Sequence, residues 1–120
     1  MILVDTSIWI DHLRHGDPVL IRILNSGRVF CHPYIIGEVA LGTPANRTLT
    51  LHDLRRLPLA TLATDAEVMS LVENERLFES GIGWVDAHLL ASTLLTPNTQ
   101  LWCRDRRLSL AANQLGVGVP

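Results

Sequence analysis

The sequence contains no lysine: all ten of its basic residues are arginine, and twelve residues are acidic. The formal net charge is −2, so the protein has no overall positive field that would attract nucleic acid. Arginine suits phosphates and stacked bases better than lysine does. A GC-rich genome would produce the same bias, however, so the arginines alone identify no function.

Cysteines and long apolar runs are also scarce. Cys31 and Cys103 show no paired spacing, which excludes a zinc motif and a disulfide framework. No apolar stretch approaches the roughly 20 residues that a membrane span needs. Asp5 interrupts the first apolar run too early for a secretory signal, and no basic segment precedes that run. These absences lead us to expect a cytoplasmic protein.

The length and composition predict one globular domain over residues 1–120, because 120 residues can build one core but not two. Short apolar segments alternate with helical patterns along the whole chain. Strands are expected at residues 2–5, 28–31, 57–62, 100–103 and 116–120. Strands alternating with helices predict an α/β fold, a three-layer α/β/α sandwich with a central parallel sheet of four to five strands.

Local signals mark where several helices begin. Thr6 is expected to cap the helix that follows the first strand. Asp17 and Pro18 form a cap followed by proline at the first helical position. Thr64 and Glu67 have the spacing of a capping box, with the apolar side of a helix after them.

Four carboxylates occupy positions that such a fold would gather at one edge. Asp5 and Asp105 each follow an apolar strand, and Glu38 and Asp86 lie in the opening turns of apolar helices. In a parallel α/β sheet, strand ends and helix starts share the edge where ligands bind. Four negative groups there repel one another, so some are protonated or a cation neutralises them. Oxygen ligands favour Mg²⁺ or Mn²⁺ over zinc.

Each carboxylate also has a structural explanation when it is taken alone. Asp5 and Asp86 could cap helices or lie favourably at helix starts. Glu38 and Asp86 are harder to explain, since a buried unpaired carboxylate costs roughly several kcal/mol. A shared cation explains all four at once and predicts a metal-dependent phosphodiesterase. The five histidines have no metal-ligand spacing. Three arginines around the last carboxylate are candidates for phosphate contacts: Arg104, Arg106 and Arg107.

The order of these motifs resembles the PIN-domain ribonucleases, and among them the VapC toxins of bacterial toxin–antitoxin systems. The similarity lies in LVDTSIWIDHLR, GEVALG, GIGWVDAHLLASTLL and LWCRDRRLSLAA, and it covers essentially the whole chain. It implies that Asp5, Glu38, Asp86 and Asp105 are the family's four acidic residues. Thr6 or Ser7 matches a supporting hydroxyl beside the first of them. The family usually has threonine where this chain has Cys103, and a thiol is a poorer hydrogen-bond donor.

The resemblance also implies a mechanism and partners. Asp5 and Asp86 would hold Mg²⁺ or Mn²⁺, Asp105 would complete the ligand set directly or through water, and Glu38 would orient a water or bind a second ion. A VapB-type antitoxin would cover the active edge, and helices on the far side would form a homodimer. Ile8, Ile35 and Leu49 cannot all lie in the core, which leaves apolar surface for such a partner.

Three alternatives remain. A PIN-domain nuclease could process RNA outside toxin–antitoxin systems. A non-catalytic switch with an acidic pocket, like a receiver domain, would need a lysine beside the carboxylates, and the chain has none. A haloacid-dehalogenase-like phosphatase would need a second aspartate two residues after Asp5, where Ser7 stands.

Overall fold

The computed structural model describes all residues, 1–120, and contains one parallel sheet of three short strands. The central strand β1 (Ile2–Val4) pairs with β2 (Val29–Phe30) on one side and with β3 (Gln100–Trp102) on the other. The chain therefore moves from β1 to one neighbour and returns to the opposite one. Such a reversal creates a switch point between β1 and β3, which is where open α/β sheets bind ligands.

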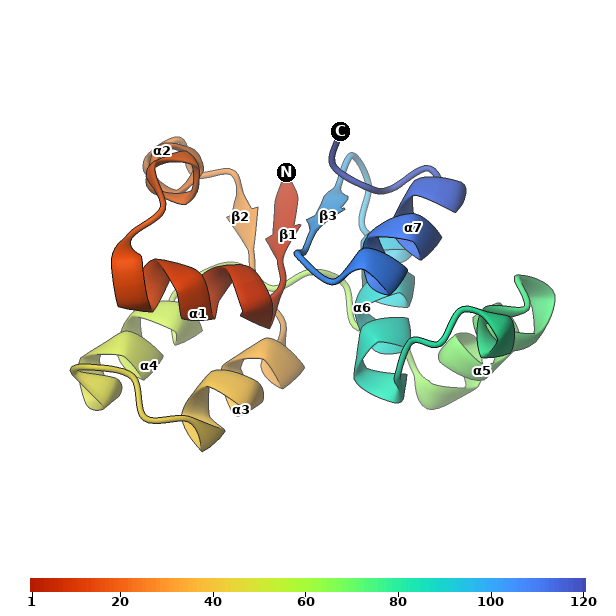
Figure 1. Ribbon diagram of the computed structural model, residues 1–120, viewed down its shortest axis with the longest axis horizontal. Coiled ribbons are helices and arrows are strands. Elements are labelled where there is room, and N and C mark those ends of the chain that lie inside the picture. Colours follow the sequence, from red (N-terminus) through yellow and green to blue (C-terminus); the bar gives the residue numbers. More distant parts are fainter.

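Seven α-helices and one 3-10 turn surround the sheet, with α1 to α4 on the β2 side and α5 to α7 on the β3 side (Figure 1). They are α1 (Thr6–His15), α2 (Pro18–Asn25), α3 (Pro33–Leu41), α4 (Arg47–Arg55), α5 (Asp65–Asn74), η1 (Leu77–Glu79), α6 (Trp84–Leu95) and α7 (Arg106–Gln114). The predicted α/β class is confirmed. None of the helices combines the length and the apolar character that crossing a membrane requires.

The prediction of four to five strands is wrong, because two of the expected strands make only single bridges. Residues 57–62 pair with the sheet at one point, between Cys31 and Leu59. Pro58 accepts a bond from Cys31 but has no N–H to extend the ladder. Residues 116–120 likewise pair only between Leu101 and Gly118.

Most of the expected helix starts are confirmed. The Asp17 carboxylate accepts bonds from Val19 and Leu20 at the start of α2. Thr64 and Glu67 form both bonds of the capping box of α5. The expected cap of α1 was wrong. Asp5 is the cap, because its carboxylate reaches the backbone N–H of Ser7, and Thr6 is the first helical residue.

One core of 20 buried residues joins the sheet to helices on both sides. Leu3 and Leu101 contribute from the sheet, and Ile8 and Ile35 are fully buried beside them. The sequence indicated that Ile8, Ile35 and Leu49 could not all lie in the core. Of these three residues only Leu49 is exposed, with 58% of its surface accessible.

His32 is the N-terminal cap of α3. The side chain is buried, and its Nδ1 accepts the backbone N–H of Tyr34 at 3.0 Å. Burial, with a smaller contribution from the nearby His88, lowers the pKa of His32 from 6.5 to about 4. The folded protein therefore keeps this ring neutral at pH values where the unfolded chain protonates it.

We predict that His32 makes folding stability depend on pH between about 6.5 and 4. The pKa is lower in the folded state, so its contribution is intact above 6.5 and is lost as the pH falls toward 4, on the order of 2–3 kcal/mol in all. His32→Asn keeps a capping acceptor but cannot titrate. Urea unfolding across this range should show a shallower pH dependence in the variant. Equal pH dependence in both proteins would contradict the assignment.

Candidate active site

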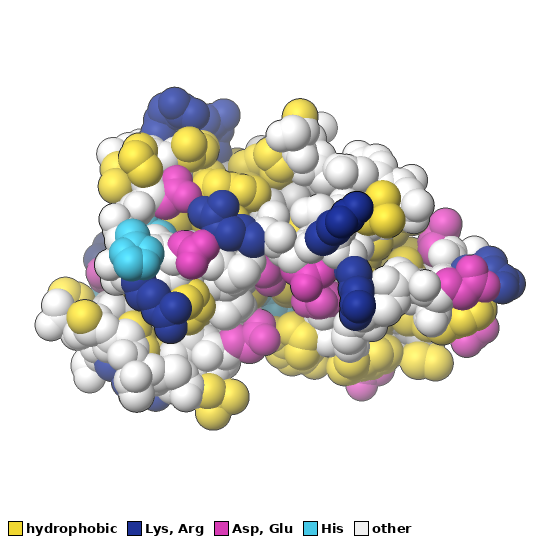
Figure 2. Space-filling view, in the orientation of Figure 1, with side chains coloured by type: hydrophobic (Ala, Val, Ile, Leu, Met, Phe, Trp, Pro, Cys, Tyr) yellow, Lys and Arg dark blue, Asp and Glu magenta, His cyan; other side chains and the backbone are white.

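The strand ends and the starts of four helices meet at one place in the molecule. The strands point toward the first turns of α1, α3, α6 and α7, which converge at the centre of the view (Figure 1). Each of these four segments carries one of the predicted carboxylates or is capped by it. Acidic atoms accordingly gather near the centre of the molecular face in Figure 2.

Asp5 is the innermost of the four carboxylates. It directly follows β1, and its backbone N–H donates to the Trp102 carbonyl of β3 at 2.9 Å. Only 7% of its surface is exposed. The Ser7 hydroxyl donates to Asp5 Oδ2 at 2.7 Å and accepts the backbone N–H of Arg104 at 3.2 Å. Ser7 therefore holds the Asp5 carboxylate and ties it to the loop that carries Asp105.

Glu38 reaches the same region from α3. The Thr6 hydroxyl donates to Glu38 Oε1 at 2.7 Å, which joins the start of α1 to α3. Thr6 and Ser7 thus hold one carboxylate each, Glu38 and Asp5 respectively. Each of the two hydroxyls considered from the sequence therefore contacts one of the four carboxylates.

Asp86 lies in the first turn of α6 and is half-buried. Burial raises its pKa, and the negative charges of Asp5, Asp105 and Glu38 raise it further. A backbone hydrogen bond from Gly83 opposes the increase. The influence of all three carboxylates on one group means that the structure brings the four predicted acidic residues together.

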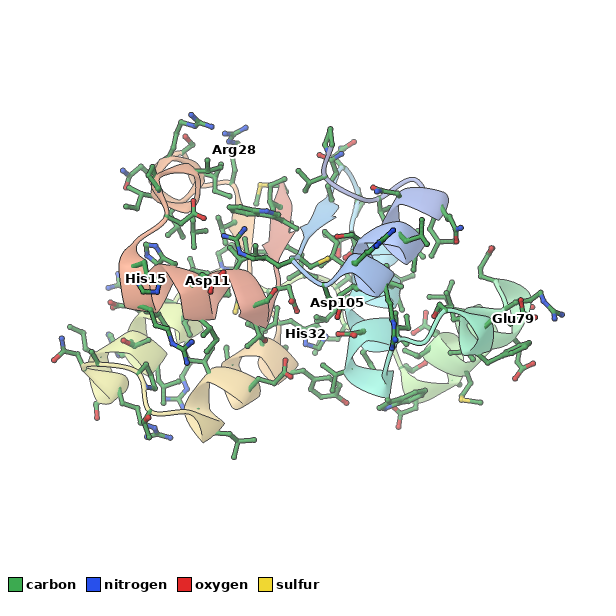
Figure 3. The ribbon with its side chains drawn as sticks, viewed as in Figure 1. Asp11, His15, Arg28, His32, Glu79 and Asp105 are labelled. Carbon is green, nitrogen blue, oxygen red and sulfur yellow. The ribbon has the colours of Figure 1, made fainter.

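Asp105 caps α7, and its Oδ1 accepts the backbone N–H of Leu108 at 2.9 Å. Figure 3 shows it between the two groups of helices. Cys103 lies close by. Burial raises the pKa of its thiol, and the charges of Asp5, Asp105 and Asp86 add to the effect. The thiol is 3.2 Å from the Ser109 hydroxyl, so its hydrogen bonding is directed to α7 and not to a carboxylate.

The three arginines beside Asp105 have different surroundings. Arg104 pairs with Asp11 of α1 and with Asp17 at 3.2 Å, so its charge is already balanced. Arg106 and Arg107 are exposed in the first turn of α7 and form no ion pair.

Neither His32 nor His88 is hydrogen-bonded to one of the four carboxylates. His88 is only two residues from Asp86, but its Nε2 contacts Asp65 at 3.1 Å on another face of α6. His32 is engaged at the start of α3.

The donor set has the chemistry that a hard divalent cation requires. In the structure, no three His, Cys, Asp or Glu side chains form a group that could hold a metal ion. Asp5, Glu38 and Asp105 each accept hydrogen bonds through one carboxylate oxygen from a neighbouring donor. The second oxygen of each of these carboxylates takes no part in these bonds. The raised pKa of Asp86 means that its negative charge is unfavourable there, and a bound cation would reduce that repulsion. Carboxylate oxygens are the type of donor that a hard divalent cation prefers.

Comparison with known proteins decides the family. No family model matches the chain. The chain is 44% identical over 119 residues to Ribonuclease VapC32 of Mycobacterium tuberculosis, from strain H37Rv and equally from strain CDC 1551. The alignment covers 99% of this chain and 96% of the relative. The chain belongs to the VapC family. The PIN-like fold expected from the sequence follows from membership in this VapC family, and the three-stranded α/β model is consistent with it.

Sequence analysis missed two features of this VapC site. One is the pairing of Arg104 with Asp11 and Asp17, which lie more than eighty residues away along the chain. The other is a row of aromatic rings, His32, Tyr34, His88 and Trp84, beside the carboxylates. In the sequence, His32 and Tyr34 lie at the start of one helix, and Trp84 and His88 lie near the start of another. Their contact could have been predicted only from the knowledge that the starts of α3 and α6 lie side by side.

We predict that Asp86→Asn stabilises the fold at neutral pH. The folded pKa of Asp86 is raised, so its ionised form opposes folding once the pH exceeds that pKa. The amide keeps the size of the side chain and removes the charge. Thermal unfolding in a metal-free buffer should give a higher Tm for the variant at pH 7 and no gain at pH 3, where both proteins are neutral at this position. A lower Tm at pH 7 would contradict this electrostatic account.

Proposed function

We propose that this VapC ribonuclease toxin, a single PIN domain over residues 1–120, hydrolyses RNA phosphodiester bonds in the cytoplasm with Mg²⁺ or Mn²⁺. The observation that carries the proposal is the raised pKa of Asp86, to which three carboxylates from three other segments contribute. Such a concentration of like charge is unfavourable for folding and suits a site that binds a cation.

The four carboxylates take different roles in the proposal. Asp5 and Asp86 would hold the cation, and Asp105 would complete the ligand set directly or through water. Glu38 is exposed and is held by the Thr6 hydroxyl, and it would orient the attacking water or hold a second cation. A bound divalent cation supplies charge neutralisation at the phosphoryl oxygens and activates water.

Hydrolysis forms a bond between the water oxygen and phosphorus and breaks the bond from phosphorus to the leaving oxygen, which takes up a proton. Arg106 and Arg107 support the proposal as the two unpaired cations next to Asp105. We assign them the phosphates that flank the cleaved bond. Arg104 instead holds α1 and the start of α2 against the Asp105 loop through its two ion pairs.

A VapB-type antitoxin is the partner that the family membership supports. An apolar cavity of about 230 Å³ opens between α1, α2 and α4, lined by residues that include Trp9, Leu13 and Leu54. The buried indole nitrogen of Trp9 has no hydrogen-bond partner. A peptide that extends from the active edge into this cavity would cover apolar surface and could accept that N–H.

A homodimer through the far side is also part of the proposal. Leu94 and Leu95 stand at the end of α6 remote from Asp86, and each is 40% exposed. Val19 and Ile21 are similarly exposed on α2. A dimer formed there would leave the acidic edge open to RNA.

We predict that Asp5→Asn and Asp86→Asn each lower RNA cleavage by at least about 100-fold, because each removes a charge from the cation site. Circular dichroism should show intact folds. Addition of Mn²⁺ should raise the Tm of the wild-type protein more than that of either variant. Asp53→Asn, on the distant helix α4, is the matched control and should cleave normally. Full activity in either site variant would refute the assignment.

The toxin role predicts a growth phenotype. Induction of the wild-type chain alone should stop bacterial growth, and expression of the small gene beside it should restore growth. The Asp5→Asn variant should be harmless in both conditions, because toxicity depends on cleavage. Growth arrest by the inactive variant would separate toxicity from ribonuclease activity. Transcript ends mapped after induction would identify the cleaved RNA.

A further inference from the structure

The four carboxylates of the acidic edge come from the two sides of the sheet. Asp5 caps α1 and Glu38 lies in α3, on the side of β2. Asp86 lies in α6 and Asp105 caps α7, on the side of β3 (Figure 1). The geometry of the site therefore depends on the contacts that join the two sides at this edge.

A loop of three residues between β3 and α7 carries the last of these carboxylates. Two side chains of the loop are directed to α7. The Cys103 thiol is 3.2 Å from the Ser109 hydroxyl, and the Asp105 carboxylate accepts the backbone N–H of Leu108. The third residue is Arg104, and it makes every hydrogen bond that joins this loop to α1 and to the start of α2.

Arg104 reaches the opposite side through both its backbone and its side chain. Its backbone N–H donates to the Ser7 hydroxyl at 3.2 Å, and that hydroxyl donates to Asp5 Oδ2 at 2.7 Å. Its guanidinium pairs with Asp11, one turn further along α1, and with Asp17 at 3.2 Å. The residue that precedes the last carboxylate is thus bound both to the first turn of α1 and to the start of α2.

Asp17 is a rigid partner for this guanidinium. Only 14% of its side chain is exposed. One carboxylate oxygen accepts the backbone N–H groups of Val19 and Leu20, and the other contacts Arg104. Its own backbone N–H donates to His12 Nδ1 at 3.0 Å. Because these bonds leave Asp17 little freedom to move, the guanidinium that it binds is held in one place.

The two ion pairs contribute more to position than to folding stability. The side chains of Arg104 and Asp11 are 49% and 45% exposed, and exposed ion pairs contribute little because water screens the charges. A planar guanidinium that contacts two carboxylates nevertheless restricts the direction of the chain that carries it. Loss of these pairs would therefore leave the protein folded and would release the loop from α1 and α2.

We propose that Arg104 is a positioning residue of the ribonuclease, which sets where Asp105 stands relative to Asp5 by holding their connecting loop against α1 and α2. The inference rests on the proposed ribonuclease function and adds a residue, outside the four carboxylates, on which the rate of cleavage depends. A misplacement of about 1 Å in a reacting site costs on the order of a hundred-fold in rate, so release of a single loop is enough to slow cleavage.

The sequence also made Arg104 a candidate for direct contact with an RNA phosphate. Its two carboxylate partners argue against that role, because they already balance its charge and would repel a phosphate. The two roles predict opposite effects when Asp11 loses its charge. A phosphate contact would become stronger, since the guanidinium is released for RNA. A positioning contact would become weaker, since the loop loses one of its supports.

The test measures kcat and KM on a short single-stranded RNA that the wild-type protein cleaves at one mapped position. Arg104→Gln should lower kcat about ten-fold or more and change KM by less than about two-fold. Asp11→Asn should lower kcat by a smaller factor, because Asp17 still holds the guanidinium. The double variant should be no slower than Arg104→Gln, since the contact that Asp11 makes is already absent. Arg104→Lys keeps the charge without the planar fork and should restore part of the rate.

Arg76→Gln is the matched control, because Arg76 also forms an exposed ion pair, with Glu79. Figure 3 shows Glu79 at the opposite end of the molecule from Asp11. This variant should cleave like the wild type. Binding is measured separately with the same RNA in the Asp5→Asn background. Addition of Arg104→Gln there should change neither the affinity nor its salt dependence, whereas loss of a phosphate contact would reduce the salt slope by about one.

Circular dichroism establishes that each variant is folded, and Asp11→Asn decides the question if Arg104→Gln is not. An unchanged kcat in the folded variants, with or without a lower Tm, overturns the positioning role. A higher KM in Arg104→Gln together with a lower KM in Asp11→Asn overturns it in favour of a phosphate contact. In both cases Asp5→Asn remains inactive, so the proposed function stands. Cleavage that survives Asp5→Asn overturns the proposed function, and the role of Arg104 with it.

Discussion

Repulsion among four carboxylates at one end of a small sheet is the constraint on which this structure depends. Asp5, Glu38, Asp86 and Asp105 come from four segments, and the charges of the other three raise the pKa of Asp86. A chain selected for stability alone would have no reason to place them together. Three of the four, Asp5, Glu38 and Asp105, are held by hydrogen bonds at the starts of helices.

Helix capping supplies that structure. Asp5 and Asp105 cap α1 and α7, so removing either would free backbone N–H groups as well as a site oxygen. Ser7 and Thr6 hold two of the carboxylates through the first turn of α1. The structural and the functional explanations of these aspartates were alternatives when only the sequence was considered. In the structure the two explanations are compatible, because one oxygen of each aspartate serves the helix and the second forms no such bond.

Local signals predicted much of this fold, and contacts between distant segments account for what they missed. The capping box of α5 and the start of α2 at Asp17 and Pro18 depend on a few adjacent residues, and both were predicted. Residues 57–62 have an apolar composition typical of a strand, but Pro58 cannot extend the ladder. The proximity of the four carboxylates was predictable because strand ends and helix starts share an edge in any parallel α/β sheet. The pairing of Arg104 with Asp11 was not, since nothing in the local sequence indicates it.

The position of α3 is fixed by its buried side. Val39 and Ile35 hold that side of α3 in the core, while Glu38 and Tyr34 project from the side that remains exposed. The Thr6 hydroxyl then fixes the Glu38 carboxylate from the first turn of α1. The position of Glu38 is therefore set by two packed helices and not by a loop, which is the kind of placement that a site orienting a reacting group requires.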